Sequence, residues 1–134
     1  MAIDVKQIST AALAYLGDSV FELLVRQMLV EKGISDSRRL NTEALKYVTA
    51  SAQAAAVRRI LAALTEEENA VYHRGRNIGH TNVPRRATVM EYRMATGLEA
   101  LFGYLHVTGR TERTRELFDI AFRTGEQDNE QSQG

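Results

Sequence analysis

The amino-acid sequence predicts an all-helical protein, and three observations support this fold class. Only one proline and nine glycines occur among the 134 residues. Alanine, leucine, glutamate and arginine, which favour helices, are abundant. No segment shows the sustained alternation of apolar and polar residues that marks a strand. The length predicts one domain with a hydrophobic core, which we expect at residues 1–125, followed by a disordered polar tail at 126–134.

The overall composition restricts the possible functions. Basic and acidic side chains balance at 17 each, so binding of nucleic acid would depend on a local basic patch. Cysteine is absent, which excludes disulfides, zinc–cysteine sites and a thiol nucleophile and suits a reducing compartment. The sequence shows no signal peptide and no apolar run of about 20 residues. We therefore expect a soluble cytoplasmic protein without membrane contact.

Residues that start and stop helices divide the chain. The starts and stops expected are Ser9 or Thr10, Gly33, Ser35 and Gly109. Thr65 and Glu68 have the spacing of a capping box. The helices that follow from these signals cover residues 10–32, 36–64, 66–74, 88–107 and 111–123, with a loop at 75–86. Thr49 and Ser51 could divide the segment 36–64 into two helices, and the sequence leaves both arrangements open.

The first expected helix carries an acid inside an apolar segment. Residues 11–16 are apolar on every side, whereas a surface helix shows only an apolar stripe. Asp18 follows almost at once, and a carboxylate in such a position costs free energy unless a cation meets it. Its neighbours Ala14, Gly17 and Ser19 are small, so another backbone or a ligand can come close.

The helix expected at 88–107 repeats this arrangement. Glu99 is its only full charge between residues 96 and 107, again among small neighbours. Gly97 and Gly103 each weaken a helix by up to about 1 kcal/mol relative to alanine, which is understandable if another element packs closely there. We therefore expect Asp18 and Glu99 to meet over a divalent metal ion such as Mg²⁺, which prefers carboxylate oxygens and can activate water at a phosphodiester.

Each acid also has an ordinary structural interpretation. Asp18, Glu22 and Arg26 are spaced four apart and could form a solvated stripe with a Glu22–Arg26 pair. Glu99 could pair with a buried arginine. Two isolated acids do not by themselves decide between these interpretations and a metal site.

Residues 73–86 contain four arginines and two histidines without one acid. Arg93 extends this basic segment onto the helix that carries Glu99. Arginine binds phosphate with its planar fork, and glycine lets a loop backbone approach a nucleic-acid strand, so the segment predicts a phosphate-binding surface. The alternative is an exposed loop that merely balances the acidic capping box beside it.

Other chemistries lack a recognisable pattern. The three histidines do not have metal-ligand spacing on a helix. Ser19 lacks the glycines two residues away on each side that a nucleophile elbow needs. No phosphate-cradling glycine motif of the nucleotide-binding type occurs.

At this point the sequence resembles a known family. Residues 15–20, YLGDSV, resemble the signature helix of ribonuclease III, and residues 98–105, LEALFGYL, resemble its second acidic helix. With RGRN at 74–77 and YRMATGLE at 92–99, the chain is most similar to the short bacterial Mini-ribonuclease III group, which has no double-stranded-RNA-binding domain. The resemblance covers about residues 8–124.

The resemblance implies a fold, an activity and partners. It implies a ribonuclease III-like helical bundle that forms a homodimer through the signature helix and cuts double-stranded RNA with Mg²⁺, one cleavage centre to each subunit. The substrate implied is the paired stem of precursor 23S ribosomal RNA, and a ribosomal protein that presents this RNA is a further candidate partner. Asp18 and Glu99 would hold the metal that activates the attacking water. The residues that would contact the RNA are Arg74, Arg76, Asn77, Arg85 and Arg86.

The sequence departs from full-length ribonuclease III at two acids. Ala14 stands where that enzyme has a glutamate four residues before the signature aspartate. Thr96 stands where it has an aspartate three residues before the second glutamate. The number of metal ions and the cleavage rate therefore stay open, as do the cut position and the need for an accessory protein.

Two further functions have to be weighed against a nuclease. A non-catalytic RNA-binding or ribosome-associated scaffold could use the same fold, but it would have no reason to keep acids in apolar grooves. A helical interaction domain unrelated to RNA would leave the arginine-rich segment without a role. Strong salt dependence of RNA binding is expected if the basic segment contacts phosphates.

Overall fold

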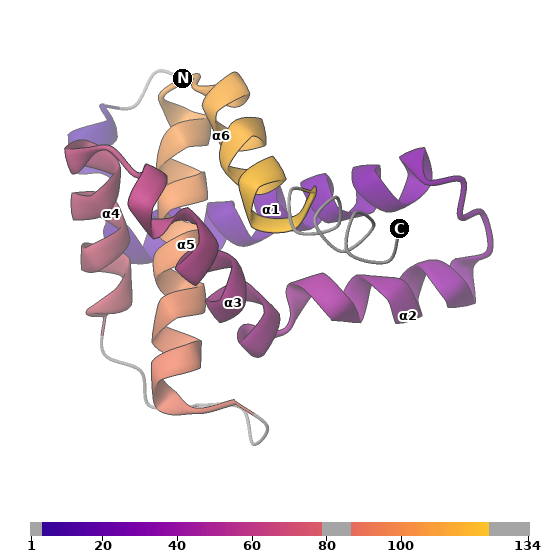
Figure 1. Ribbon diagram of the computed structural model, residues 1–134. Helices are drawn as coiled ribbons and strands as arrows, with labels where there is room; N and C mark the ends of the chain where they lie inside the picture. Colours follow the sequence, from indigo (N-terminus) through magenta and orange to yellow (C-terminus); the bar gives the residue numbers. More distant parts are fainter. Residues whose placement is uncertain (1–3, 79–86, 124–134) are drawn as a thin grey trace.

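The computed structural model describes residues 4–78 and 87–123, and in these residues it is helical without strands (Figure 1). This confirms the predicted all-α class. The main helices are α1 (Thr10–Glu31), α2 (Ser37–Val48), α3 (Ala50–Ile60), α4 (Glu66–Arg76), α5 (Val89–Val107) and α6 (Thr111–Phe118). Short elements are the 3-10 turns η1 (Val5–Gln7) and η2 (Leu61–Ala63) and a π-helical turn, η3 (Asp119–Arg123). In the described part, no helix is long and apolar enough to cross a membrane.

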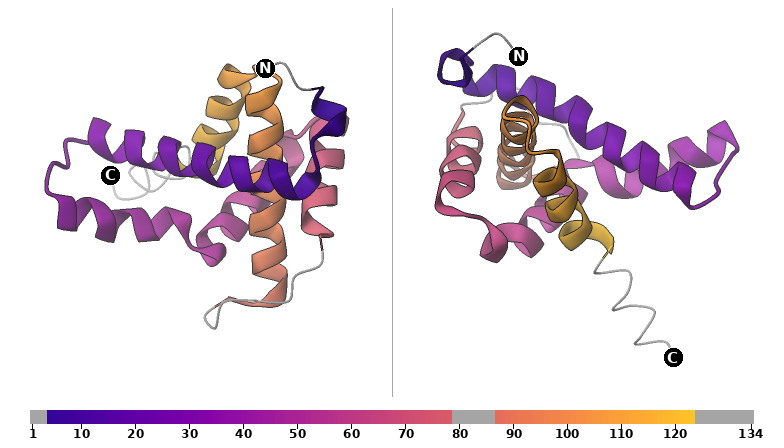
Figure 2. Two further views of the ribbon diagram at one scale, coloured as in Figure 1. Left: turned by 180° about the vertical axis from the view of Figure 1, so that it is seen from behind. Right: turned by 90° about the horizontal axis from the view of Figure 1, so that it is seen from above.

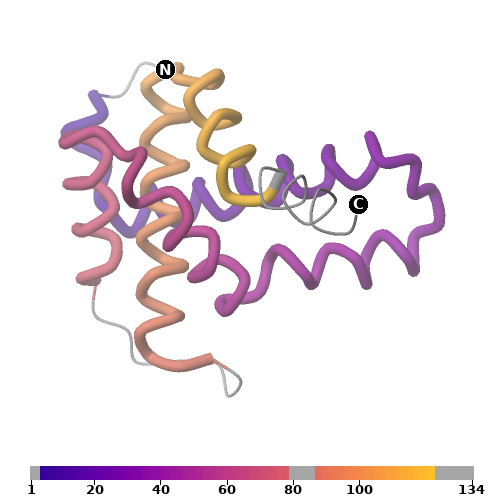
Figure 3. Tube along the Cα trace, in the orientation of Figure 1, coloured from indigo at the N-terminus to yellow at the C-terminus, as the bar shows by residue number. Residues whose placement is uncertain are grey.

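Helix α5 is the centre of the bundle. Helices α1, α3 and α4 all pack against it, and the view from above shows α1 and α3 on opposite sides of α5 with α4 beside it (Figure 2). Helix α1 crosses α5 steeply. The second half of α1 continues beyond the bundle and pairs with α2, so that the two helices form a projecting hairpin (Figure 3).

The α1–α5 crossing depends on two glycines. A Cβ atom added to Gly17 would lie 1.6 Å from the carbonyl oxygen of Glu99, and one added to Gly103 would lie 2.0 Å from that of Leu13. Any side chain at either position would therefore force the two backbones apart. The expectation that an element packs closely on Gly103 is confirmed.

An aromatic cluster closes the core beside this crossing. The ring of Phe21 on α1 lies 5.9 Å from that of Phe102 on α5 and 6.0 Å from that of Phe118 on α6. Phe122 completes the cluster at 5.9 Å from Phe21. All four rings are buried, and tilted or edge-on aromatic pairs at such distances add to the free energy of burial.

Most predicted helix ends are confirmed. Ser9 caps α1 by accepting a hydrogen bond from the backbone N–H of Ala12 at 3.0 Å. Gly33 and Gly109 follow α1 and α5 with φ values of 87° and 75°, a conformation that glycine adopts without strain. The capping box that begins α4 at Thr65 is present.

Two boundaries differ from the prediction, and the structure decides a third that the sequence left open. Asp36, not Ser35, caps α2, because its carboxylate accepts from the backbone N–H of Arg39 at 3.0 Å. Thr49 ends α2 and caps α3, so the segment 36–64 is divided there. Helix α4 continues to Arg76, so the loop expected from Gly75 starts later. The tail predicted at 126–134 lies outside the described residues.

Candidate active site

The α1–α5 crossing brings the two predicted acids together. Gly17 rests on the backbone of Glu99, and Asp18 is the next residue, so its side chain comes within hydrogen-bonding range of the Glu99 carboxyl. Burial, reinforced by the negative charge of Asp18 and by the hydrogen bond between the two groups, raises the pKa of Glu99 to about 8. With this raised pKa the Glu99 carboxyl holds its proton at pH 7 unless a cation binds beside it.

The structure distinguishes between the interpretations of the acids. Within the described residues, neither Asp18 nor Glu99 forms an ion pair with a basic side chain. Glu22 and Arg26 do pair, at 2.8 Å, with both side chains exposed. The Glu22–Arg26 pair considered for the surface of α1 is therefore present, but Asp18 takes no part in it. The buried arginine considered as a partner for Glu99 is not found among the described residues.

The two acids line a pocket of about 220 Å³. Helix α1 contributes Ala11, Ala14, Tyr15 and Asp18, α5 contributes Tyr92, Thr96 and Glu99, and Ile78 follows the end of α4. The Thr96 hydroxyl donates a hydrogen bond to the carbonyl of Tyr92 at 3.0 Å and is buried. The two positions at which full-length ribonuclease III carries additional acids, Ala14 and Thr96, thus line the pocket without contributing charge.

The chemistry of this pair fits a divalent cation. Hard cations such as Mg²⁺ bind carboxylate oxygens and keep several waters, so they can be held by one or two acids. The pocket beside the acids leaves room for such waters, and no basic side chain competes for the carboxylates in the described part of the chain. No group of three or more His, Cys, Asp or Glu side chains there could hold a metal ion instead.

Arg76, one of the residues predicted to contact RNA in a loop at 75–86, lies in a helix instead. Arg74 and Arg76 lie in the last turn of α4, and Asn77 is its C-cap, with its backbone N–H bonded to the carbonyl of His73 at 3.0 Å. Gly75 is buried, where an added Cβ would meet Ala100 at 2.7 Å and the Cα of Gly97 at 2.9 Å. This glycine therefore serves helix packing, which corrects the idea that it lets a loop approach RNA. Arg85 and Arg86 lie outside the described residues.

The sequence interpretation gave no role to Tyr92, Ile78 and Tyr15, which line the pocket. A signal was available for the first of them, because Tyr92, Thr96 and Glu99 follow the i, i+4, i+7 spacing of one helix face. Ile78 carries no such signal, since its position depends on where α4 ends.

Fold and pocket together define a class: a helical bundle with a paired-carboxylate candidate metal site next to a basic helix end. The family model of the ribonuclease III domain matches residues 11–110. Mini-ribonuclease 3 of Enterococcus faecalis is 42% identical over 129 residues, which are 95% of this chain and 98% of that protein. Mini-ribonuclease 3 of Streptococcus pneumoniae is 44% identical over 117 residues, 86% of this chain and 91% of that protein.

A solved structure agrees with these relatives. The crystal structure of protein FN1578 from Fusobacterium nucleatum superposes with a TM-score of 0.82 at 31% identity, covering 92% of this chain and 99% of that one. The chain belongs to the ribonuclease III family, in its Mini-ribonuclease III group, and is an endoribonuclease. Enzymes of this family act on double-stranded RNA and generally use a divalent metal.

Proposed function

We propose that this chain is a Mg²⁺-dependent endonuclease that cuts double-stranded RNA at the Asp18–Glu99 pair. The observation that carries the proposal is the meeting of these two carboxyl groups at the glycine-mediated crossing of α1 and α5, without a basic partner among the described residues. A structural ion pair would have placed an arginine or lysine there. A carboxyl pair without one is costly, and its retention is best explained by a cation that binds during function.

The two acids have different positions in the site. Glu99 is half-buried on α5, where Gly17 packs against its backbone, whereas Asp18 is exposed on α1. With its raised pKa, Glu99 holds a proton at pH 7 in the metal-free protein, and this proton has to leave when both carboxylates bind a cation. The bound cation would supply an activated water for attack on the phosphodiester and offset charge on the phosphate.

Recognition of the RNA is proposed to depend on phosphate contacts. Arg74, Arg76 and Asn77 lie at the end of α4, directly before Ile78 in the pocket wall, and Arg85 and Arg86 are proposed to extend this surface. The deep, narrow major groove of an RNA duplex cannot be read by side chains, so recognition by shape and phosphate position suits such a surface.

The substrate and setting follow from the similarity to Mini-ribonuclease III. We infer that the stem is that of precursor 23S ribosomal RNA, cut in the cytoplasm, with a ribosomal protein as a candidate partner that presents it. Cleavage of this stem in preference to an unrelated duplex of equal length and base composition supports this substrate. Equal cleavage of both duplexes would contradict this substrate while leaving the proposed double-stranded-RNA nuclease activity intact.

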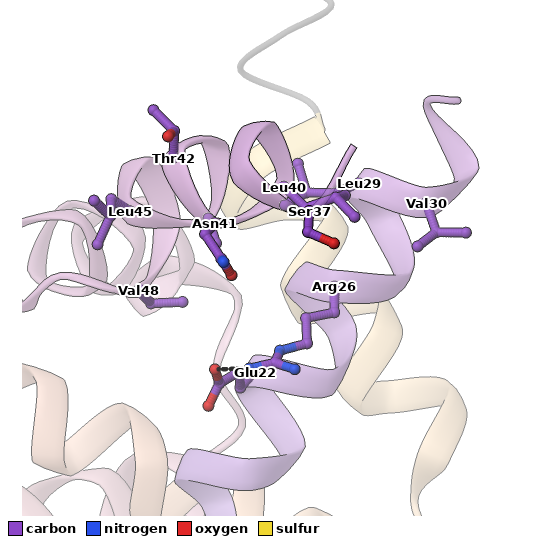
Figure 4. Close-up of a pocket in the computed structure, with 11 residues that line it drawn as sticks. Glu22, Arg26, Leu29, Val30, Ser37, Leu40, Asn41, Thr42, Leu45 and Val48 are labelled. Atoms are coloured by element: carbon purple, nitrogen blue, oxygen red, sulfur yellow. Dashed lines mark hydrogen bonds and ion pairs between the residues drawn. The ribbon is translucent and has the colours of Figure 1, made fainter. Parts of the chain in front are cut away.

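A homodimer through α1 is proposed on the basis of exposed apolar side chains. Tyr15, Leu23 and Val30 on α1 and Leu45 on α2 are 85%, 63%, 62% and 60% exposed. Between the two helices lies a groove of about 650 Å³ with Val30, Leu40, Leu45 and Val48 in its walls and the Glu22–Arg26 pair at one end (Figure 4). Exposed large apolar side chains on two paired helices are typical of a protein–protein interface.

The deciding experiment is cleavage of a labelled RNA stem with Mg²⁺ by the wild type, Asp18→Asn and Glu99→Gln. Loss of cutting in both variants with retained RNA binding supports the proposed site. Glu112→Gln, an exposed acid on α6, is the matched control and should cut normally. Binding without cutting by the wild type, on duplex and on precursor ribosomal RNA, would instead support the scaffold function.

A further inference from the structure

A buried threonine on α5 lies at the candidate active site. In the described part of the chain, the buried polar and charged side chains are Gln53, Glu68, Thr96 and Thr114. Thr96 is 8% exposed and lines the pocket of Asp18 and Glu99. A buried hydroxyl costs free energy unless hydrogen bonds replace those that it made with water. The partners of the Thr96 hydroxyl therefore bear on what the pocket can hold.

The Thr96 hydroxyl uses its hydrogen inside α5. It donates to the carbonyl of Tyr92, one turn earlier, at 3.0 Å, a bond that threonine often forms within a helix. A hydroxyl has one hydrogen to donate and two lone pairs that accept. Because the hydrogen is already used, the Thr96 oxygen can take part in further hydrogen bonds only as an acceptor. Among the described residues no group donates to it.

This acceptor is close to both acids. Thr96 and Glu99 are three residues apart on one face of α5, a spacing that puts their Cβ atoms about 5–6 Å apart. Asp18 reaches the Glu99 carboxyl from α1 within hydrogen-bonding range. All three side chains border the same pocket of about 220 Å³.

A hydrated divalent cation complements such an acceptor. Mg²⁺ keeps several waters at about 2.1 Å, and these waters donate hydrogen bonds because their lone pairs face the cation. A donated hydrogen bond spans about 2.8 Å between oxygens. One water can therefore connect a cation on the two carboxylates to a hydroxyl oxygen that lies one helical turn from Glu99.

We propose that the Thr96 hydroxyl accepts a hydrogen bond from a water in the hydration shell of the divalent cation. Thr96 is then a positioning residue that strengthens the binding of this cation to Asp18 and Glu99. The inference rests on the proposed metal-dependent nuclease function. Groups that hydrogen-bond to the ligands of a metal change its affinity by about 10–100-fold when they are removed.

The test is binding of Mg²⁺ by the full chain without RNA, measured as the rise of melting temperature with Mg²⁺ concentration at one fixed pH. Thr96→Val keeps the shape of the side chain without the hydroxyl, and Thr96→Ser keeps the hydroxyl without the methyl group. Single-turnover cleavage of duplex RNA over the same Mg²⁺ concentrations is the second measurement.

Thr114→Val is the matched control. The Thr114 hydroxyl is also buried and donates at 3.0 Å to the carbonyl of Arg110, one turn earlier, but it lies on α6 and does not line the pocket. At both positions the carbonyl also accepts the backbone N–H of the threonine, as in any α-helix. Valine therefore leaves neither carbonyl unpaired, and the two variants differ in their position relative to the pocket.

We expect Thr96→Val to need about tenfold more Mg²⁺ than the wild type for half of the full stabilisation. Thr96→Ser and Thr114→Val should need the wild-type concentration. Cleavage should show the same shift, and the rate of Thr96→Val should recover at high Mg²⁺, since the hydroxyl acts through the binding of the cation.

Wild-type Mg²⁺ dependence in Thr96→Val, or an equal loss of affinity in Thr96→Ser, would show that the inference is wrong, while cleavage by the wild type would leave the proposed function standing. If Thr96→Val does not fold, Thr96→Ala gives the same comparison with Thr96→Ser. If Mg²⁺ binds only together with RNA, the shift in cleavage decides. If Mg²⁺ neither stabilises the wild type nor supports cleavage, the proposed function is wrong as well.

Discussion

Replacing Gly17 by alanine tests how the candidate site is assembled. The new Cβ would start 1.6 Å from the Glu99 carbonyl oxygen, whereas real Cβ contacts stay beyond 3.0 Å. The α1 and α5 backbones must therefore separate by at least 1.4 Å, the difference between these two distances. The atom in the way belongs to the backbone, so no side-chain rotation can relieve the contact.

The expected magnitudes follow from this separation. Overpacking of a core costs about 1–3 kcal/mol, and we expect the upper end of that range, reduced by about 1 kcal/mol because alanine favours a helix over glycine. The net loss of unfolding free energy is then about 2 kcal/mol. A misplacement of about 1 Å between catalytic groups can lower the rate by about 100-fold, so cleavage should fall more than stability alone explains.

Urea unfolding and single-turnover cleavage of a duplex at saturating protein measure these two effects. Gly33→Ala is the control, because it has open space around its Cβ but a φ of 87° that strains alanine. It should lose about 1 kcal/mol of stability with normal cleavage. Wild-type stability and cleavage in Gly17→Ala would refute the claim that close backbone contact positions the two acids.

Three further predictions test the electrostatics and the proposed dimer. The folded protein raises the pKa of Glu99 to about 8 from the usual value of 4.5, so the stabilising contribution of the protonated Glu99 carboxyl in the metal-free protein is fully present below pH 4.5 and is lost as pH rises through 8. Thermal unfolding in the presence of a chelator should show this decline with pH. Parallel stability profiles for the wild type and Glu99→Gln would contradict it. Glu68 is 2% exposed and bonds Arg113 through both oxygens at 2.8 Å, so Glu68→Ala should cost about 3 kcal/mol in urea unfolding, against less than about 1 kcal/mol for the exposed partner variant Glu116→Ala. Leu45→Glu in the groove of α1 and α2 should shift the mass measured by light scattering from dimer to monomer, whereas the exposed Leu61→Glu should not; a monomeric wild type would exclude the proposed interface at the concentration used.

Much of the fold and the two acids at the centre of the candidate site could be predicted from the sequence. A lone carboxylate among small residues in an apolar helix distinguishes Asp18 and Glu99 as candidates, and the structure brings the two side chains together. Gly103 gave the second clue, since a glycine inside a helix costs stability unless something packs on it. Each of these signals lies within a few residues of one helix, so it can be recognised from the sequence alone. The contact between the two helices is what the structure adds.

The sequence could not show where α4 ends. Gly75 and Asn77 are residues typical of turns, and they favoured a loop from Gly75 onward. In the structure the close approach of Gly75 to Gly97 and Ala100 outweighs the helix cost of a glycine. Tertiary packing of this kind is not visible in local propensity, and it decides which side of α4 presents Arg74 and Arg76.

Neighbouring arginines illustrate the same limit on α3. Arg58 and Arg59 are adjacent and indistinguishable in charge and propensity. In the folded chain Arg59 donates a hydrogen bond to the Ala121 carbonyl at 2.8 Å, whereas Arg58 is exposed and forms no ion pair among the described residues. Only the packing of α3 against η3 gives Arg59 its structural role.

The position of the acids at the tightest helix crossing has a physical reason. Aspartate and glutamate side chains are short, so two helices can hold their carboxyl groups in contact only if the backbones nearly touch, which glycine at 17 and 103 permits. The same closeness buries Glu99 beside Asp18 and raises its pKa, so the metal-free site opposes folding near pH 8. A cation that binds both carboxylates removes this cost and stabilises the folded chain in proportion to its affinity. The proposed metal would therefore contribute both to catalysis and to the stability of the α1–α5 crossing.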